Sequence, residues 1–321
     1  MARLDVERLR AGFTGPHEVV RASDGQRLFL RRWDAPGESP VSLLVLHGIT
    51  AHSGPYGPPL AEPLARAGVP VFGMDLRGHG LSDGVRGDYP GPRRFASDLA
   101  ETVAYVKARS KRLVVLGHSL GSLSAVVAQR QRPRDVDGVI LLSAGTRIRA
   151  ERYRRPTGAA ALRSLVGVAL LRGTPLIDYR RPGMLGLDDP LFNFRYSARF
   201  YTVLYGVPAR PLLRMMRTGL VDSPNLRFEP RLRVPLLVAV GDQDELIPVD
   251  SARALCDAAN GEDKEFLPIP GGRHAVFPKE APELLRGWLS RKVGAGPGPE
   301  GEARRGLSGA GAAEGGGPAP P

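Results

Sequence analysis

Cysteine and long hydrophobic runs are both nearly absent from this chain of 321 residues. Its single cysteine, Cys256, excludes a framework of disulfide bonds and any zinc site built on cysteine. The longest apolar stretch, residues 158–173, is interrupted by Arg163 and is too short to span a bilayer. The first ten residues, MARLDVERLR, lack the apolar centre of a secretory signal. We therefore expect a cytoplasmic protein with Cys256 in its core.

Lysine is also scarce, although the chain is strongly basic. Only five of its 45 basic residues are lysines, the formal net charge is +12 and the isoelectric point is about 10.4. Such basicity raises the question of nucleic-acid binding. The sequence contains no helix-turn-helix, no zinc finger and no strand that combines basic with aromatic residues. An excess of arginine together with abundant alanine, glycine and proline is typical of a GC-rich genome, so we expect no nucleic-acid partner.

Glycine and proline, by contrast, are abundant, at 70 of the 321 residues. Part of this excess lies in the last 28 residues, which contain ten glycines, five prolines and six alanines without apolar periodicity. A segment of this composition buries too little surface to offset its ordering entropy. We predict a disordered tail over residues 294–321 and a turn-rich body before it.

Short apolar runs alternate with helical patterns along the body of the chain. Residues 17–22 and 26–33 flank an Asp-Gly turn at Asp24, which predicts a hairpin. The later apolar runs are unbroken, as in parallel strands buried on both faces, and their alternation with helices predicts a doubly wound, mostly parallel α/β sheet. The expected strands cover 41–47, 69–75, 112–118, 137–143, 234–241 and, more weakly, 264–270. The expected helices cover 60–67, 93–109, 121–131, 248–260 and 280–292.

The alternation stops between residues 146 and 233. This segment has no apolar run of buried-strand type, and its prolines and glycines divide it into several short helices. Because strands precede and follow it, we predict a helical cap inserted into a sheet domain made of residues 1–145 and 234–293. From Arg147 to Arg233 the segment contains 17 arginines, no lysine and six acidic residues, so it carries nearly the entire net charge.

A serine lies at one of the predicted strand-to-helix turns. Residues 117–121 read Gly-His-Ser-Leu-Gly, directly after the apolar run at 112–116 and before a helical pattern. The pattern G-x-S-x-G in this context is typical of a nucleophile elbow, where glycines let neighbouring backbone pass closely. The pentapeptide alone occurs by chance, but its placement between a buried strand and a helix is much rarer. We predict that Ser119 is a nucleophile.

A nucleophilic serine needs a base and an acid that orients the base. Of the six histidines only His274 follows Ser119, and the chain order for this type of elbow is serine, acid, histidine. The acid is expected in the loop 241–248, where three carboxylates compete: Asp242, Asp244 and Glu245. We choose Asp244, with Asp242 as the second candidate. Capping of the following helix explains one of these carboxylates but not all three.

Acyl transfer at a serine also requires N–H donors that stabilise the oxyanion. The backbone N–H of Leu120, directly after the nucleophile, is the first candidate. The second is expected from the loop after the apolar run 41–47, which begins His47-Gly48-Ile49. We predict that Ile49 supplies this N–H and that Gly48 permits the turn that directs it.

Together these residues resemble the α/β-hydrolase superfamily and, more narrowly, serine hydrolases of the monoacylglycerol lipase and lysophospholipase type. The matching segments follow the order of that family: HGITAHSGPY (47–56), G-x-D-x-R-G-H-G-x-S (73–82), GHSLGS (117–122), GDQDELIP (241–248) and GGRH (271–274). The resemblance implies an α/β-hydrolase fold whose functional residues are Ser119, Asp244 and His274, with Ile49 and Leu120 as oxyanion donors. It implies a bracing role beside the site for Asp75, Arg77 and His79. The segment HSGPY favours the monoacylglycerol lipase branch.

We therefore expect a hydrolase of small lipid esters, such as a monoacylglycerol or a lysophospholipid, that works through an acyl-enzyme and needs neither cofactor nor metal. Within the superfamily that this chain resembles, epoxide hydrolases and haloalkane dehalogenases carry aspartate where this chain has Ser119, since their intermediate is an alkyl ester. A thioesterase, a peptidase or a cofactor-free perhydrolase on the same scaffold is the alternative. A non-catalytic binding protein is less favoured because no member of the triad is missing.

The basic cap allows one more interpretation. An apolar segment, Ala159–Leu171, follows a run of five arginines, and this combination is suited to contact with anionic lipid. The arginines are Arg147, Arg149, Arg152, Arg154 and Arg155. We favour a cap helix that packs on the core with solvated arginines, and peripheral contact with an anionic membrane stays as the alternative.

Overall fold

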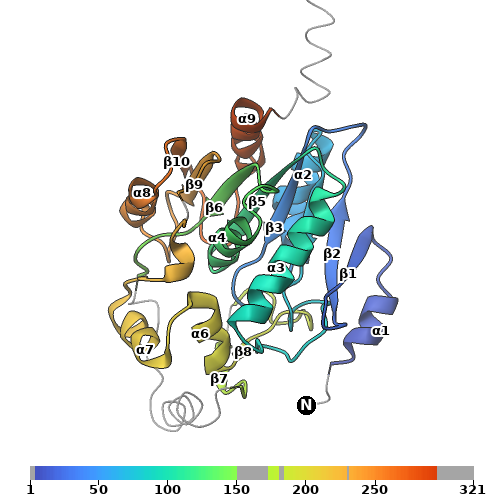
Figure 1. The fold of residues 1–321 in the computed structure, drawn as a ribbon, viewed down its shortest axis with the longest axis vertical. Coiled ribbons are helices and arrows are strands. Elements are labelled where there is room, and N and C mark those ends of the chain that lie inside the picture. The colour runs from blue at the N-terminus through green and yellow to red at the C-terminus, as the bar shows by residue number, and fades with distance from the viewer. Residues whose placement is uncertain (1–3, 150–172, 181–183, 230, 295–321) are drawn as a thin grey trace, which may run out of the picture.

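The computed structural model describes residues 4–149, 173–180, 184–229 and 231–294 (Figure 1). The predictions for the apolar segment 159–171 and for the tail after Gly294 lie outside these residues. The described chain is built on one eight-stranded sheet. Its strands lie side by side in the order β1 (His17–Arg21), β2 (Arg27–Trp33), β4 (Val71–Met74), β3 (Val41–Leu46), β5 (Arg112–His118), β6 (Gly138–Leu142), β9 (Leu236–Gly241) and β10 (Lys264–Ile269).

The strands from β4 to β10 are parallel, whereas β2 pairs antiparallel with both β1 and β4. The connecting helices are α2 (Glu62–Arg66), α3 (Pro92–Lys107), α4 (Gly121–Gln131), α8 (Val249–Ala258) and α9 (Ala281–Val293). The short helix α1 (Val6–Ala11) precedes the sheet, and two helical turns lead into α2: η1 (Gly54–Tyr56) and η2 (Gly57–Ala61). Apart from α1 and these turns, every strand and helix named so far was predicted from the sequence.

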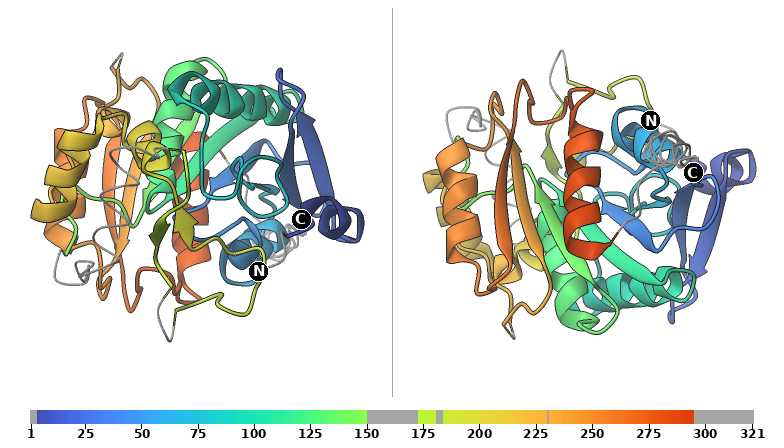
Figure 2. Two further views of the ribbon diagram at one scale, coloured as in Figure 1. Left: turned by 90° about the horizontal axis from the view of Figure 1, so that it is seen from below. Right: turned by 90° about the horizontal axis from the view of Figure 1, so that it is seen from above.

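Apolar side chains fill both faces of the sheet, and the helices cover both (Figure 2). Along β5, Leu113 and Val115 belong to the core cluster that includes α3, α4 and α8. The alternate residues Val114 and Leu116 belong to the other cluster, which includes α2 and α9. Each central strand is therefore buried on two sides, which is why its sequence is an unbroken apolar run. The predicted doubly wound α/β sheet is confirmed, and Cys256 is buried as expected.

Parallel alignment brings the carboxyl ends of the central strands to one edge of the sheet. Leu46 at the end of β3 pairs with Gly117 of β5, and Gly241 at the end of β9 pairs with Ile269 of β10. The loops that follow β3, β5, β9 and β10 therefore lie close together. These four loops carry all of the predicted site residues.

The segment predicted as a cap connects β6 to β9, which are adjacent parallel strands. Its described residues form two helices, α6 (Ala198–Tyr205) and α7 (Ala209–Thr218), and a helical turn, η4 (Pro224–Leu226). They also form an antiparallel ribbon of β7 (Ile177–Asp178) and β8 (Arg195–Tyr196). The ribbon was not expected, because two residues per strand leave no periodicity to detect. Figure 1 shows α6 and α7 beyond one end of the sheet; the boundaries at 146 and 233 stay a prediction.

Among the described residues, every helix is too short or too polar to cross a bilayer.

Candidate active site

Ser119 lies in the tight turn between β5 and α4. Its φ angle is +53°, in the left-handed region that residues with a side chain rarely adopt. The turn depends on two glycines, because a Cβ at Gly117 would lie 2.3 Å from the carbonyl oxygen of Gly121. A Cβ at Gly121 would lie 2.1 Å from the carbonyl oxygen of Leu46 in β3. The strand-to-helix elbow expected from the sequence is present, with Ser119 at its tip.

His274 lies between Ser119 and Asp244. Its Nε2 is 2.9 Å from Ser119 Oγ, and its Nδ1 is 3.0 and 3.1 Å from the two carboxyl oxygens of Asp244. The imidazole and the carboxyl group are both buried. A carboxylate only accepts hydrogen bonds, so Nδ1 carries the proton and Nε2 is free to accept one from the serine. This is the geometry required of a nucleophile, a base and an acid that orients the base.

The two competing carboxylates contact the backbone of the histidine loop. Asp242 Oδ1 accepts the N–H of Gly271 at 2.8 Å, and Glu245 Oε2 accepts the N–H of His274 at 3.1 Å. The same loop lies against the end of β9, where a Cβ on Gly241 would come within 2.1 Å of a carbonyl oxygen. Asp242 and Glu245 thus hold the loop, while Asp244 contacts the ring. The geometry favours Asp244 over Asp242 as the partner of His274.

The Asp244 carboxylate is held in its charged form. Burial alone would raise its pKa, but the hydrogen bond and charge of His274 and the backbone N–H groups of Ile247 and Leu246 lower the pKa below its ordinary value. Both N–H groups donate to the same carboxyl oxygen at 2.8 Å. A carboxylate that stays ionised in this position can stabilise a protonated imidazole.

Ile49 and Leu120, the predicted oxyanion donors, line a small pocket beside the elbow. The remaining lining residues are His47, Gly48, Leu76, His79, Phe200 and Leu204. Within the described part of the chain, no group accepts the backbone N–H of Ile49 or of Leu120. The two loops lie in close contact, since a Cβ on Gly48 would be 3.2 Å from the Cβ of Ser119. Both N–H groups are therefore available to a negative charge that develops beside Ser119.

A chain of hydrogen bonds joins three loops of the site, and sequence reasoning missed it. The N–H of Gly48 donates to the hydroxyl of Tyr56 at 3.0 Å, and this hydroxyl donates to His118 Nδ1 at 2.7 Å. His118 Nε2 in turn donates to the carbonyl oxygen of His274 at 2.7 Å. Since a carbonyl only accepts, the direction of the whole chain is determined. Tyr56 and His118 lie inside recognised motifs, but no pattern in the sequence brings them together.

The three residues that the family resemblance assigned to bracing are all buried, and each makes polar contacts. The buried carboxylate of Asp75 accepts the N–H of Ser53 at 2.7 Å and the N–H of Leu81 at 2.8 Å. Arg77 forms an ion pair with Asp98 on α3 at 2.7 Å. His79 contacts the cap, and its partners are described below. The contact of Asp75 with Ser53 connects the loop after β4 to the loop that carries Ile49, whereas Arg77 connects it to α3.

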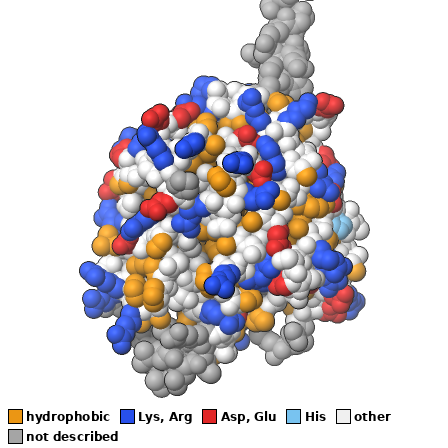
Figure 3. All heavy atoms as spheres, viewed as in Figure 1, with side chains coloured by type: hydrophobic (Ala, Val, Ile, Leu, Met, Phe, Trp, Pro, Cys, Tyr) orange, Lys and Arg blue, Asp and Glu red, His pale blue; other side chains and the backbone are white. Residues whose placement is uncertain are grey.

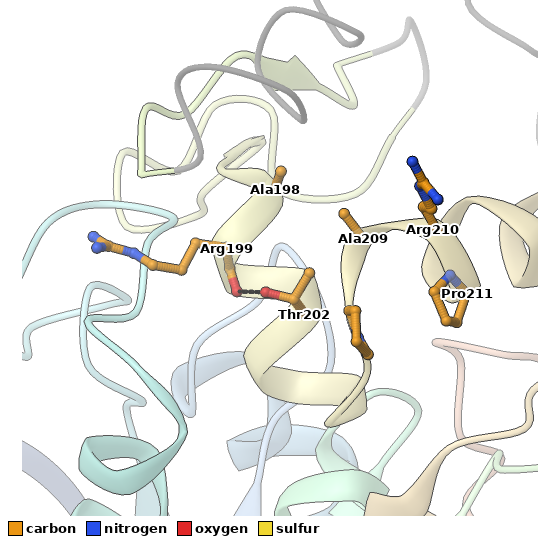
Figure 4. A pocket seen from close by; sticks show the side chains of 7 residues that line it. Ala198, Arg199, Thr202, Ala209, Arg210 and Pro211 are labelled. Atoms are coloured by element: carbon orange, nitrogen blue, oxygen red, sulfur yellow. Dashed lines mark hydrogen bonds between the residues drawn. The ribbon is translucent and has the colours of Figure 1, made fainter.

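A second pocket lies apart from these residues, between α6 and the start of α7 (Figure 4). Its lining contains none of the predicted site residues: Ala198, Arg199, Thr202, Pro208, Ala209, Arg210 and Pro211. Thr202 donates to the carbonyl oxygen of Arg199, whose side chain points away from the pocket and pairs with Asp88. Among the described residues, no group of histidine, cysteine and acidic side chains could hold a metal ion.

Known proteins resemble this chain in sequence and in fold. The sequence model of a family described as serine aminopeptidase, S33, matches residues 38–281. The monoglyceride lipase of Rattus norvegicus is 29% identical over 295 residues, which cover 87% of this chain and 91% of the relative. The monoacylglycerol lipase of Mycolicibacterium smegmatis is 30% identical over 264 residues, which cover 81% and 90%. A structure of a soluble variant of the monoglyceride lipase of Saccharomyces cerevisiae superposes with a TM-score of 0.66 over 87% of this chain and 96% of that one, at 18% identity.

The buried histidines make the stability of the fold depend on pH. Burial lowers the pKa of His47 to about 4 and that of His118 to about 3, from an ordinary value of 6.5. Between about pH 6.5 and about pH 4 the unfolded chain binds protons that the folded chain excludes, so the free energy of unfolding falls as the pH falls. We expect a decrease of up to about 1.4 kcal/mol per pH unit for each histidine, measured by urea unfolding at a series of pH values.

A variant separates the contribution of the buried histidines to this pH dependence from that of the carboxylates. The pKa of Asp244 lies below 3.8, so its contribution is lost only at lower pH. The substitution His118→Gln removes one titrating group, and its free energy of unfolding should therefore change less steeply with pH than that of the wild type. The slope is the readout, whatever the absolute stability of the variant. Equal slopes in the two proteins would contradict the assignment of His118 as a buried neutral group.

Proposed function

The chain belongs to the serine aminopeptidase S33 family of α/β-hydrolases, and we propose that it hydrolyses carboxylic esters of small lipids through a covalent acyl-enzyme. In this proposal Ser119 is the nucleophile, His274 the base and Asp244 the acid that orients it. The N–H groups of Ile49 and Leu120 form the oxyanion hole. The observation that carries the proposal is the 2.9 Å contact between Ser119 Oγ and His274 Nε2, with Asp244 at the other ring nitrogen.

The first half of the reaction forms the acyl-enzyme. Ser119 Oγ attacks the ester carbonyl carbon while its proton passes to His274 Nε2, and the carbonyl oxygen becomes an oxyanion beside the N–H groups of Ile49 and Leu120. The charged carboxylate of Asp244 stabilises the imidazolium that results. When the tetrahedral intermediate collapses, the bond to the leaving oxygen breaks, and His274 gives its proton to the departing alcohol.

The second half releases the acid. A water molecule gives a proton to His274 Nε2 as its oxygen attacks the acyl carbon, and the same two N–H groups stabilise the second oxyanion. Collapse then breaks the bond to Ser119 Oγ, which recovers its proton from His274. The net reaction converts one ester and one water into one carboxylic acid and one alcohol. The residues named above account for every proton transfer in it.

Two observations support a lipid ester as the substrate. The pocket beside the oxyanion donors is lined largely by apolar groups, among them Leu76, Phe200 and Leu204. The relatives named above are monoglyceride and monoacylglycerol lipases that align over most of this chain. We therefore propose a monoacylglycerol as the preferred substrate, with a lysophospholipid as the next candidate because it carries the same acyl-glycerol ester.

The cap side of the molecule supports peripheral contact with anionic lipid. Three apolar side chains of this region are exposed, Leu213 (44%), Met216 (38%) and Leu220 (55%). Three exposed arginines accompany them on α7, and none pairs with a carboxylate among the described residues: Arg210, Arg214 and Arg217. Figure 3 shows hydrophobic side chains beside basic ones on this face, at the lower left. We infer that this surface, the α7 surface, rests on anionic membranes with its arginines at the headgroups.

Substitution of the triad tests the mechanism. We expect Ser119→Ala to abolish hydrolysis of a short p-nitrophenyl ester and labelling by a fluorophosphonate probe, with an unchanged circular dichroism spectrum. By analogy with a serine protease, Asp244→Asn should lower kcat by about 10⁴-fold, because the imidazole loses its orienting carboxylate. The matched control Asp242→Asn should retain most of the activity, since among the described residues this side chain accepts a hydrogen bond from the backbone of Gly271 and not from the His274 ring, and asparagine keeps an acceptor oxygen. Full activity in Ser119→Ala, or a larger loss in Asp242→Asn, would exclude these assignments.

A substrate panel tests the proposed chemistry of the substrate. The purified protein would be given a monoacylglycerol, a lysophospholipid, an acyl-CoA and an N-terminal peptide amide, and kcat/KM would be measured for each. We expect the highest value for the monoacylglycerol, because apolar side chains predominate beside the proposed oxyanion donors and the relatives named above are monoacylglycerol lipases. A preference for the thioester or for the peptide would favour the thioesterase or peptidase alternative.

Vesicle sedimentation tests the α7 surface. We expect binding to vesicles that contain phosphatidylserine, little binding to pure phosphatidylcholine, and weaker binding as salt rises. Arg214→Ala should weaken binding about fivefold, since each basic residue at an anionic surface contributes about 1 kcal/mol. Arg134→Ala is the control, because this exposed arginine lies on the loop before β6, at the opposite end of the strands. Equal binding to both lipids, or an equal effect of the two substitutions, would contradict the inference.

A further inference from the structure

We propose that Tyr196, a residue of the cap, is a positioning residue for the oxyanion hole and acts through the backbone of Thr50. This inference rests on the proposed function, because it concerns the same oxyanion hole. Tyr196 lies on β8, 146 positions away from Thr50 in the sequence. It belongs to none of the motifs that identify the site.

Thr50 has a conformation that needs support. Its φ angle is +66°, and a β-branched residue in the left-handed region is a steric outlier. Strain of this kind persists only where neighbouring groups hold the backbone in place. Because Thr50 directly follows Ile49, its conformation sets the path of the chain at the proposed oxyanion donor. Relaxation of Thr50 to an ordinary φ angle would therefore rotate the peptide plane between Ile49 and Thr50 and shift Ile49 relative to Ser119.

Residues of the cap hold both backbone groups of Thr50. The hydroxyl of Tyr196 accepts the N–H of Thr50 at 2.8 Å, and the N–H of Asn193 donates to the carbonyl oxygen of Thr50 at 2.8 Å. The side chain of Tyr196 is fully buried, so water does not replace the first of these bonds. The loop after β3 is thus held in its strained form from the cap side.

The orientation of the Tyr196 hydroxyl follows from His79. His79 Nδ1 lies 3.1 Å from the carbonyl oxygen of Arg77, so this nitrogen carries the proton and donates it. His79 Nε2 is then an acceptor, and it lies 3.2 Å from the Tyr196 hydroxyl. Burial keeps the pKa of His79 well below its ordinary value, which agrees with a neutral ring. Tyr196 therefore donates to His79, and its oxygen is left to accept the N–H of Thr50.

Tyr196 itself is fixed to the core. The next residue, Ser197, donates its N–H to the carbonyl oxygen of Gly87 at 2.9 Å, and its hydroxyl donates to Asp88 at 2.5 Å. The Tyr196 ring packs on Phe200 of α6 with centroids 4.6 Å apart. A hydroxyl on a ring held in this way is a rigid anchor, so the support it gives to Thr50 does not depend on a mobile side chain.

The test is Tyr196→Phe, which keeps the ring and removes the hydroxyl. We expect kcat for a p-nitrophenyl ester to fall about tenfold, less than the loss on removal of a direct oxyanion donor, with KM changed by less than about twofold. Hydrogen exchange at the peptide that covers residues 47–52 should become faster, because the N–H of Thr50 loses its acceptor. Tyr105→Phe is the control, since that hydroxyl lies on α3 and donates to Glu18 on β1.

A second substitution tests whether the effect passes through Thr50. Glycine adopts a φ angle of +66° without strain, so Thr50→Gly lowers the need for an anchor. In the Tyr196→Phe background, Thr50→Gly should restore part of the lost kcat. A loss that stays the same in the double variant would overturn the proposed route through Thr50, even if Tyr196→Phe alone is impaired.

The exchange measurement keeps this inference separate from the proposed function. If wild-type protein neither hydrolyses the ester nor reacts with a fluorophosphonate, the proposed function fails, while exchange at residues 47–52 still reports the contact. Unchanged exchange in Tyr196→Phe would overturn the positioning role. If the wild type is active and is labelled at Ser119, an unchanged kcat in Tyr196→Phe would also overturn this role. A loss of kcat matched by Tyr105→Phe would show only general destabilisation and would also overturn it.

Discussion

The left-handed turn at Ser119 is the constraint on which the rest of the site depends. A serine at this φ angle is strained, and the strain is held by the close packing of β3, β5 and the first turn of α4. At Gly121 the backbone of α4 lies directly against the carbonyl oxygen of Leu46. A side chain there would push the end of β3 away from the elbow. The contact that exposes Ser119 therefore also sets the distance to Ile49, three residues beyond Leu46.

Neutral buried histidines turn this backbone geometry into a connected site. His118 connects the Tyr56 hydroxyl to the carbonyl oxygen of His274, the proposed base, and His47 connects Gly48 to the N–H of Leu76. An imidazole that stays neutral has one donor and one acceptor nitrogen, so it can join two loops with a defined direction. Apolar residues would fill the same space but would leave these backbone groups without hydrogen-bond partners. Each polar group that is buried unpaired destabilises the fold. The polar interior of the site thus determines the relative positions of its loops.

The sequence predicted the sheet, its helices and the residues brought together at Ser119, because each rests on a local pattern. Buried parallel strands are unbroken apolar runs, and an elbow with flanking glycines has a short signature. The acid was harder to assign, since three carboxylates lie within one loop. Only the structure shows that Asp244 contacts the ring of His274, whereas Asp242 contacts the backbone of Gly271. The contacts of Tyr56 and Tyr196 could not be predicted at all. They join residues far apart in the chain through single hydroxyl groups, and a tyrosine in a sequence indicates burial but not its partner.

The described part of the cap divides into two regions with different constraints. β8 and the start of α6 are hydrogen-bonded to the loop 78–88 and, through Tyr196, to Thr50, so we expect a change there to alter the proposed chemistry at Ser119. α7 buries only Leu212 and Met215 and exposes most of its remaining surface, so it can vary without moving the oxyanion loop. Substitutions on the exposed face of α7 can therefore alter the proposed contact with membranes while the geometry at Ser119 is retained. The inserted segment leaves the sheet where β6 ends, at the edge that carries Ser119, and it returns to the opposite edge, where the parallel strand β9 begins. On this path β8 and the start of α6 contact the loops beside Ser119, whereas α7 exposes most of its surface.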